Sequence, residues 1–199
     1  RQRQMCIRDS RNRAASFFAL TLPTGYVKTL TSLRVALEAC KGGECERVVY
    51  VAPYISILSQ AALEMARASG LEVVTHHHLS PLEMGDEGDV DVLDTWQAPV
   101  VATTFNQFFR ALFPARAQEC LRREALHRAF VIVDEPQIID TAVWNLFLRV
   151  LESSAQEWGC RVLFATATLP PLELGLRDAA VPLAGGTEAS GRFALRYSA

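Results

Sequence analysis

Short, strongly apolar stretches alternate with longer amphipathic stretches along most of the chain, and this alternation constrains the fold more than any other feature. Apolar stretches that lack a polar face occur at residues 16–22, 47–52, 71–75, 99–102, 129–133 and 161–165. Apolar side chains at helical spacing mark residues 28–40, 56–69, 105–113 and 141–158, and the charged residues 114–128 are also expected to be helical. Strands buried on both faces and separated by helices predict an α/β fold with three layers, in which helices cover both faces of a parallel sheet.

The composition fits one globular domain. The chain has 199 residues, of which 50% are hydrophobic and 21% are charged, and its net charge is −2. This balance excludes a disordered chain and a strongly basic nucleic-acid tail. No apolar run reaches the roughly 18 residues that a membrane span needs, so no membrane partner is expected. The five cysteines form no CxxC pair, which favours reduced thiols and a cytoplasmic location.

The sequence divides into three parts. Residues 1–13 carry five arginines and no apolar periodicity, and we expect a non-native or disordered N-terminal segment. Residues 14–180 contain the alternating pattern and are expected to form the domain. Residues 181–199 are glycine-rich and lack clear periodicity, so a frayed or truncated C-terminal segment is expected.

A phosphate-binding loop is indicated between the first apolar stretch and the first helical stretch. Thr24 and Gly25 precede the pair Lys28 and Thr29, much as in the pattern GxxxxGK[ST]. In that pattern, backbone N–H groups and the helix N-terminus surround phosphates, the lysine contacts the β- and γ-phosphates, and the hydroxyl ligates Mg²⁺. A chance strand–turn–helix sequence is the alternative.

Val27 departs from this pattern, because it stands where glycine is expected. Glycine lets the backbone approach a phosphate without a Cβ atom. A β-branched residue there would strain the backbone at positive φ or obstruct that approach, at a cost of about 1–3 kcal/mol for strain alone.

Two further signals follow apolar strands. Asp134 and Glu135 end the stretch at 129–133, where the aspartate would hold Mg²⁺ and the glutamate would act as general base. The alternative is an acidic helix N-terminus.

Thr166 and Thr168 follow residues 161–165. Their hydroxyls could relay γ-phosphate occupancy to a neighbouring domain by hydrogen bonds. The alternative is a helix cap before a short helix at 171–177.

Together these segments resemble the first RecA-like domain of superfamily 2 helicases. Within that superfamily, they are most similar to the CRISPR-associated helicase-nuclease of type I systems. The resemblance rests on LPTGYVKTLTSLRVAL, RVVYVAPYISILSQ, HHHLS, WQAPVVATTFNQFFRALF, VIVDEPQ and FATATLP.

The resemblance implies a P-loop NTPase domain that uses ATP and Mg²⁺ to move 3′ to 5′ on single-stranded DNA in antiviral defence. Nucleotide-binding residues by motif match are Thr24, Gly25, Lys28 and Thr29, with Asp134 and Glu135 serving metal and water. Thr166 and Thr168 would couple hydrolysis to movement. Segments that touch the DNA backbone in related helicases contain Pro53, Tyr54, Thr103 and Thr104.

The resemblance also implies partners. They are an RNA-guided CRISPR surveillance complex, and an HD nuclease domain and a second RecA-like domain that these residues do not contain. Because the second RecA-like domain supplies an arginine finger, the isolated domain is expected to hydrolyse ATP poorly. Two other functions stay open: a non-catalytic nucleic-acid-binding or docking module that has lost ATP binding, which Val27 favours, and a DEAD-box-like RNA helicase fragment.

Two residue groups are expected to be structural. Consecutive histidines at 76–78 point to alternate faces of an extended segment, so they suit a surface or nucleic-acid-proximal loop better than a metal site. Four phenylalanines at helical spacing, Phe105, Phe108, Phe109 and Phe113, are expected in the core rather than stacked on bases.

Overall fold

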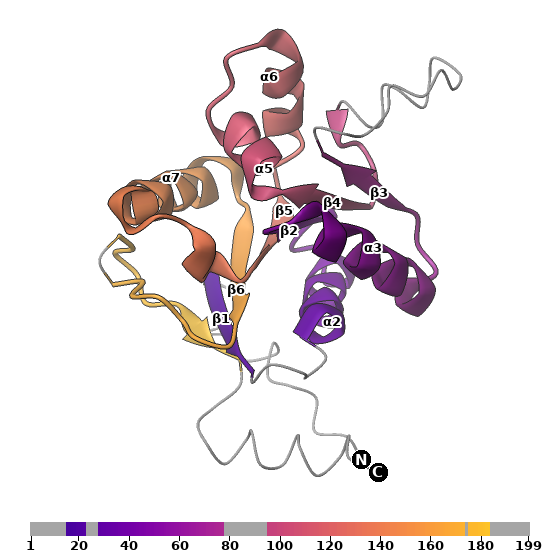
Figure 1. Ribbon diagram of the computed structural model, residues 1–199, viewed down its shortest axis with the longest axis horizontal. Coiled ribbons are helices and arrows are strands. Elements are labelled where there is room, and N and C mark those ends of the chain that lie inside the picture. Colours follow the sequence, from indigo (N-terminus) through magenta and orange to yellow (C-terminus); the bar gives the residue numbers. More distant parts are fainter. Residues whose placement is uncertain (1–14, 23–27, 78–94, 174, 184–199) are drawn as a thin grey trace.

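The structure is a computed structural model that describes residues 15–22, 28–77, 95–173 and 175–183. A seven-stranded sheet forms its centre, with the strand order β3-β4-β2-β5-β6-β1-β7 (Figure 1). Every pairing in the sheet is parallel. The strands are β1 (Phe17–Thr21), β2 (Arg47–Ala52), β3 (Val73–His76), β4 (Val100–Thr104), β5 (Ala129–Asp134), β6 (Arg161–Thr166) and β7 (Val181–Pro182).

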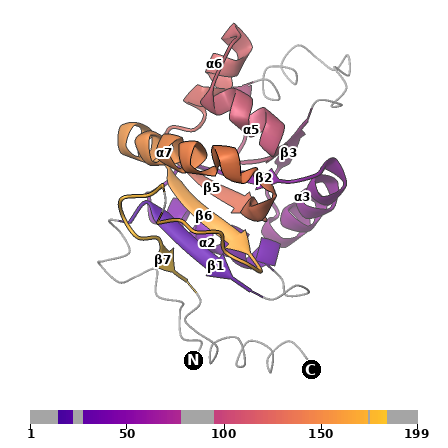
Figure 2. The same ribbon diagram turned by 60° about the vertical axis from the view of Figure 1, so that its left-hand side comes forward.

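Helices cover both faces of this sheet, as Figures 1 and 2 show. One face carries α2 (Lys28–Lys41) and α3 (Ile55–Ser69), and the other carries α5 (Phe105–Leu112) and α7 (Thr141–Trp158). A further helix, α6 (Ala117–Glu124), packs against α5, and a short 3₁₀ helix, η1 (Pro136–Ile138), follows β5. The predicted three-layer α/β architecture is confirmed.

The core consists of two apolar layers, one on each face of the sheet. Side chains alternate between the faces along each strand: Val49 and Val51 of β2 join the layer beneath α5 and α7, whereas Val48 and Tyr50 join the layer beneath α2 and α3. All of these side chains are fully buried. Because both faces of β2 lie in the core, its sequence is continuously apolar instead of alternating.

A glycine follows each of two helices at its carboxyl end. Gly70 follows α3 with φ of 68°, and Gly159 follows α7 with φ of 65°. Each backbone N–H closes the last turn on a carbonyl four residues earlier. Such left-handed geometry is easiest for glycine because it has no Cβ atom.

The structure differs from the sequence expectations at residues 181–182, at residues 171–177 and at Phe113, among other places. Val181 and Pro182, expected in a frayed segment, form the edge strand β7 and pair with Phe18 and Ala19 of β1. A strand of only two residues is too short to show the periodicity by which strands are recognised. The described residues between 171 and 177 form turns and no helix. Phe113 is 48% exposed, since α5 ends at Leu112 and the chain turns away from the core.

Parallel strands bring all their carboxyl ends to one edge of the sheet, and ligands of such sheets bind beyond that edge. The segments that follow β1, β5 and β6 are neighbours there, because these three strands are adjacent in the order β5-β6-β1. The segments that follow β2 and β4 also lie beside each other. The topology therefore creates two neighbouring groups of strand ends.

Candidate nucleotide-binding site

Three strand ends bring together most of the described residues predicted for catalysis. Lys28 begins α2, Asp134 is the last residue of β5, and Thr166 is the last residue of β6. The register pairs Asp134 with Ala165, and Thr21, at the end of β1, with Thr166. Residues more than a hundred positions apart thus meet at one edge of the sheet.

Lys28 and Glu135 form an ion pair across this edge, with a hydrogen bond from Nζ to Oε1. Their side chains are only 11% and 25% exposed, so water screens the pair less than it screens a surface pair. The predicted phosphate-binding lysine therefore lies directly beside the predicted general base.

A hydrogen-bond network surrounds Glu135 on its other side. Thr166 Oγ1 lies 3.1 Å from Glu135 Oε2, 2.7 Å from Gln137 Oε1 and 3.0 Å from the Thr168 carbonyl, and it accepts a bond from the Thr168 N–H. Gln137 Nε2 donates to Glu135 Oε2 at 2.7 Å. The structure thus joins the Asp-Glu segment to the Thr-Ala-Thr segment.

The backbone at Glu135 is unusual. Its φ and ψ are 50° and 57°, the left-handed region that residues with a Cβ atom rarely adopt. Its N–H bonds to the Ala165 carbonyl at 2.9 Å, which holds the turn in place. Such strain of about 1–3 kcal/mol is often found at functional sites.

Asp134 lies in a more enclosed position than Glu135. It is 7% exposed, and its Oδ2 accepts a hydrogen bond of 2.5 Å from the Tyr50 hydroxyl. The other carboxylate oxygen, Oδ1, is buried and has no protein partner among the described residues. A carboxylate that keeps one buried oxygen free suits coordination of a cation such as Mg²⁺.

The two adjacent carboxyl groups have pKa values shifted in opposite directions. Burial raises the pKa of Asp134 above its ordinary value, although the Tyr50 hydrogen bond and the Lys28 charge oppose it. Burial also acts to raise the pKa of Glu135, but hydrogen bonds from Lys28 and Gln137 and the Lys28 charge outweigh it and lower that pKa. Glu135 is therefore held ionised, as a general base must be at neutral pH.

Sequence reasoning missed two residues of this site, Tyr50 and Gln137. Tyr50 is in the middle of an apolar strand and is fully buried, so it reads as a core aromatic residue. Gln137 follows the Asp-Glu pair by two positions, and that proximity was the only sequence signal for it. Thr29 was predicted, and it is the second residue of α2, directly after Lys28. Thr24, Gly25 and Val27 lie outside the described residues.

The predicted DNA-contacting residues lie at the second group of strand ends. Tyr54 is 56% exposed and precedes α3, directly after Pro53. Thr103 is fully buried, and its hydroxyl donates to the His76 carbonyl at 2.9 Å. Thr104 is 6% exposed, and its hydroxyl is buried without a partner among the described residues. Tyr54 is therefore the accessible side chain of the three.

The histidine segment does not form a metal cluster within the described residues. The surface-loop expectation is wrong for His76, which is the last residue of β3 and is buried; its ring meets the Trp96 ring edge to face, with centroids 5.9 Å apart. In the described part of the chain, no three His, Cys, Asp or Glu side chains are arranged to hold a metal ion. His78 lies outside that part.

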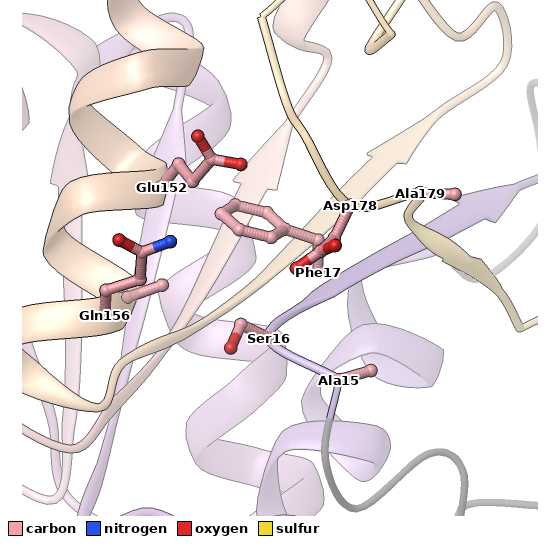
Figure 3. Close-up of a pocket in the computed structure, with 8 residues that line it drawn as sticks. Ala15, Ser16, Phe17, Glu152, Gln156, Asp178 and Ala179 are labelled. Carbon is pink, nitrogen blue, oxygen red and sulfur yellow. The ribbon is translucent and has the colours of Figure 1, made fainter.

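A separate cavity of about 250 Å³ lies at the amino end of β1, away from the carboxyl ends described above. Figure 3 shows Phe17, Glu152 and Gln156 around it. Glu152 accepts a hydrogen bond of 2.6 Å from the Arg177 backbone, so its carboxylate already has a partner. The cavity does not contain any of the predicted site residues.

The site as a whole fits a magnesium nucleotide. A lysine ammonium at the start of a helix suits phosphate, and the open Asp134 oxygen and the Thr29 hydroxyl suit a hard cation. Glu135 lies next to both and is held anionic. This arrangement, at the edge of a parallel sheet, defines a class of nucleotide-binding domain found in molecular motors.

Comparison with known proteins supports this class. The family model for the DEAD/DEAH box helicase matches residues 4–174, so the chain belongs to that family. The chain is also 34% identical over 185 residues to the CRISPR-associated nuclease/helicase Cas3 of Haloferax volcanii. That match covers 80% of this chain and 19% of Cas3, so the chain spans about a fifth of the curated relative. The resemblance expected from the motifs is confirmed.

Solved structures show the same fold. The Sulfolobus solfataricus SWI2/SNF2 ATPase core in complex with dsDNA matches 84% of this chain and 31% of its own, with a TM-score of 0.52 and 20% identity. The DUF1998 helicase MrfA bound to DNA and AMPPNP matches 81% of this chain and 23% of its own, with a TM-score of 0.56 and 15% identity. The fold is therefore the RecA-like fold of helicase and ATPase cores.

Among the described residues, no helix is both long and apolar enough to cross a bilayer.

Proposed function

We propose that this chain is the ATP-binding motor domain of a CRISPR-associated, ATP-dependent DNA helicase. The single observation that carries the proposal is the meeting of Lys28, Glu135 and Thr166 at the ends of β1, β5 and β6. The similarity to Cas3 supports the CRISPR association and a role in antiviral defence. By the same similarity, we propose translocation from 3′ to 5′ on single-stranded DNA.

In the proposed reaction, Lys28 binds the β- and γ-phosphates of ATP, together with the segment that contains Thr24 and Gly25. Thr29 and Asp134 would hold Mg²⁺, and the bound ion would supply positive charge to neutralise the phosphates. When Lys28 turns from Glu135 toward phosphate, it releases the Glu135 carboxylate to accept a proton from the attacking water. The ion pair and the nucleotide therefore compete for the same ammonium group.

Thr166 and Thr168 are proposed to report the state of this site to a second domain. Thr166 has one hydroxyl proton and three acceptors within 3.1 Å, so it can bond to Glu135, Gln137 or Thr168, but to only one at a time. A change at Glu135 would change which acceptor it uses. Such a two-state bond is a physical basis for coupling hydrolysis to movement.

For DNA, we propose contacts at the ends of β2 and β4. Tyr54 is exposed and can stack on a base, and Pro53 and the backbone at Thr103 and Thr104 lie beside it. An RNA-guided surveillance complex, an HD nuclease domain and a second RecA-like domain are the proposed partners, by similarity to Cas3. The described cysteines are all free, which suits the reducing cytoplasm that we propose as the location.

One observation favours a second function. Val27 replaces the glycine of the phosphate loop, and a Cβ atom there opposes close contact with phosphate. If that contact is lost, the chain would be a nucleic-acid-binding or docking module without ATP binding. The two functions make different predictions for nucleotide affinity.

Calorimetric titration with Mg-ATP separates them. The chain, Lys28→Ala and Val27→Gly are compared, with Lys41→Ala as a matched control, because Lys41 ends the same helix and its side chain is 76% exposed. We expect the unaltered chain to bind, Lys28→Ala to bind about 30-fold or more weakly, and Lys41→Ala to bind normally.

Two outcomes would count against the proposed function of this site. Binding by Val27→Gly alone would show that valine disables an otherwise complete site and would favour the second function. Binding that survives Lys28→Ala would show that the nucleotide lies elsewhere.

A further inference from the structure

Tyr50 places a hydroxyl group in an otherwise apolar layer. It is in β2, its side chain is fully buried, and its neighbours in the same core layer include Phe130 and Ile132 of β5. A phenylalanine would fill the same space without a polar atom. Burying a hydroxyl is costly unless it is hydrogen-bonded, so the hydrogen-bond partner of the Tyr50 hydroxyl indicates its role.

The hydrogen bond of this hydroxyl leads to the nucleotide site. Tyr50 donates to Asp134 Oδ2 at 2.5 Å. Asp134 is the last residue of β5, and it is one of the two residues proposed to hold Mg²⁺. One buried phenol therefore contacts a proposed metal ligand directly.

The geometry at Asp134 shows what the phenol does. It occupies Oδ2, while Oδ1 stays buried and without a partner among the described residues. A carboxylate bonded through one oxygen cannot rotate freely, so the open oxygen keeps its direction. Residues that orient a metal ligand in this way typically change metal affinity by about 10- to 100-fold when they are replaced.

We propose that Tyr50 is a positioning residue for Mg²⁺: it fixes the Asp134 carboxylate through Oδ2. This inference rests on the proposed function, since it concerns the same site. It adds that β2, a strand without a predicted nucleotide contact, sets the metal affinity of the site. Phosphate binding by Lys28 needs no help from the phenol.

The test compares Tyr50→Phe with the unaltered chain by titrating Mg²⁺ at fixed ATP and following nucleotide binding. We expect the Mg²⁺ midpoint to rise about 10-fold or more, with the affinity for ATP in excess EDTA unchanged. Ser154→Ala is the control, because it removes another buried hydroxyl, one that bonds to the Val150 carbonyl within α7. It should change neither quantity.

An equal loss of ATP affinity with and without Mg²⁺ would indicate a merely structural role and overturn the inference. An unchanged Mg²⁺ midpoint would overturn it as well. If the unaltered chain binds no nucleotide at all, the proposed function fails, and the metal part of this inference fails with it.

A second measurement needs no nucleotide. Urea unfolding of Tyr50→Phe, Asp134→Asn and the double variant measures the coupling between the two side chains. We expect the double variant to be more stable than Tyr50→Phe, because Asn carries no charge to leave unpaired. Purely additive effects would mean that the Tyr50–Asp134 bond does not hold the carboxylate, and would overturn the inference.

Discussion

The two groups of strand ends differ in what their polar side chains contact. At the ends of β1, β5 and β6, Lys28 and Thr166 each bond to Glu135. At the ends of β2 and β4, the Thr103 hydroxyl is used by the His76 carbonyl, and the Thr104 hydroxyl is buried and unpaired within the described residues. Both groups lie at the ligand-binding edge, so position alone does not make a catalytic site.

The difference has a physical origin in charge. Lys28 and Glu135 attract each other, and their partly exposed side chains lie beyond the strand ends, where a phosphate or a water molecule could replace either partner. Hydroxyl groups without charge gain little from each other, and the Thr103 hydroxyl is satisfied by a nearby carbonyl. The first group can therefore exchange partners during a reaction, whereas in the second group Thr103 and Thr104 are buried and Tyr54 is exposed.

The same substitution at the two groups should give the largest contrast. Thr166→Val removes the hydroxyl shared by Glu135, Gln137 and Thr168, and Thr103→Val removes one bond to a carbonyl. Urea unfolding should show a loss of about 2 kcal/mol for Thr166→Val and about 1 kcal/mol for Thr103→Val. Only the first should alter Mg-ATP binding. Equal effects on binding would remove the distinction between the groups.

A pH titration tests whether charge distinguishes the first group. The pKa of Glu135 is lowered below its ordinary 4.5, so the unfolded chain takes up the proton first as the pH falls. The stability that Glu135 provides is therefore fully present above about pH 5 and is lost as the pH falls through its folded pKa. Relative to Glu135→Gln, the natural chain should have a free energy of unfolding about 1 kcal/mol higher at pH 7. In acid, the two free energies of unfolding should be equal.

Glu38→Gln is the matched control for this titration. Glu38 faces Lys41 on α2 at 4.0 Å, but both side chains are more than half exposed. Exposed pairs contribute little, so its replacement should change stability negligibly at any pH. A stability difference for Glu135→Gln that did not vary with pH would mean that the Lys28–Glu135 pair contributes no charge-dependent stability.

Much of the fold was predictable because its strands and helices carry strong local signals. The stretch at 129–133 has no polar residue, and α7 occupies residues 141–158, as its spacing and Gly159 indicate. β7 was missed because two residues at a sheet edge gain their structure only from pairing with β1. The local sequence has no signal that predicts the pairing of β7 with β1.

The site was predictable only where its residues follow strands. Lys28, Asp134, Glu135 and Thr166 stand at strand or helix ends, where motifs are readable. Tyr50 was not predictable, because a tyrosine within RVVYVA looks like any core aromatic residue. Its role depends on β2 and β5 being neighbours, which the order of strands in the sequence does not reveal.

Thr104→Val should have the smallest effect, and its sign is informative. Thr104 precedes α5 at the position where a hydroxyl often caps a helix, yet it makes no such bond and is buried. An isosteric valine should leave the free energy of unfolding in urea unchanged or raise it by up to about 1 kcal/mol.

Asp140→Ala is the matched control, because Asp140 does cap α7 by accepting a hydrogen bond from the Ala142 N–H. Loss of this cap should lower the free energy of unfolding by about 1 kcal/mol. A destabilised Thr104→Val would show that this hydroxyl has a partner within the folded chain, whereas weaker binding of single-stranded DNA without destabilisation would indicate a contact with DNA.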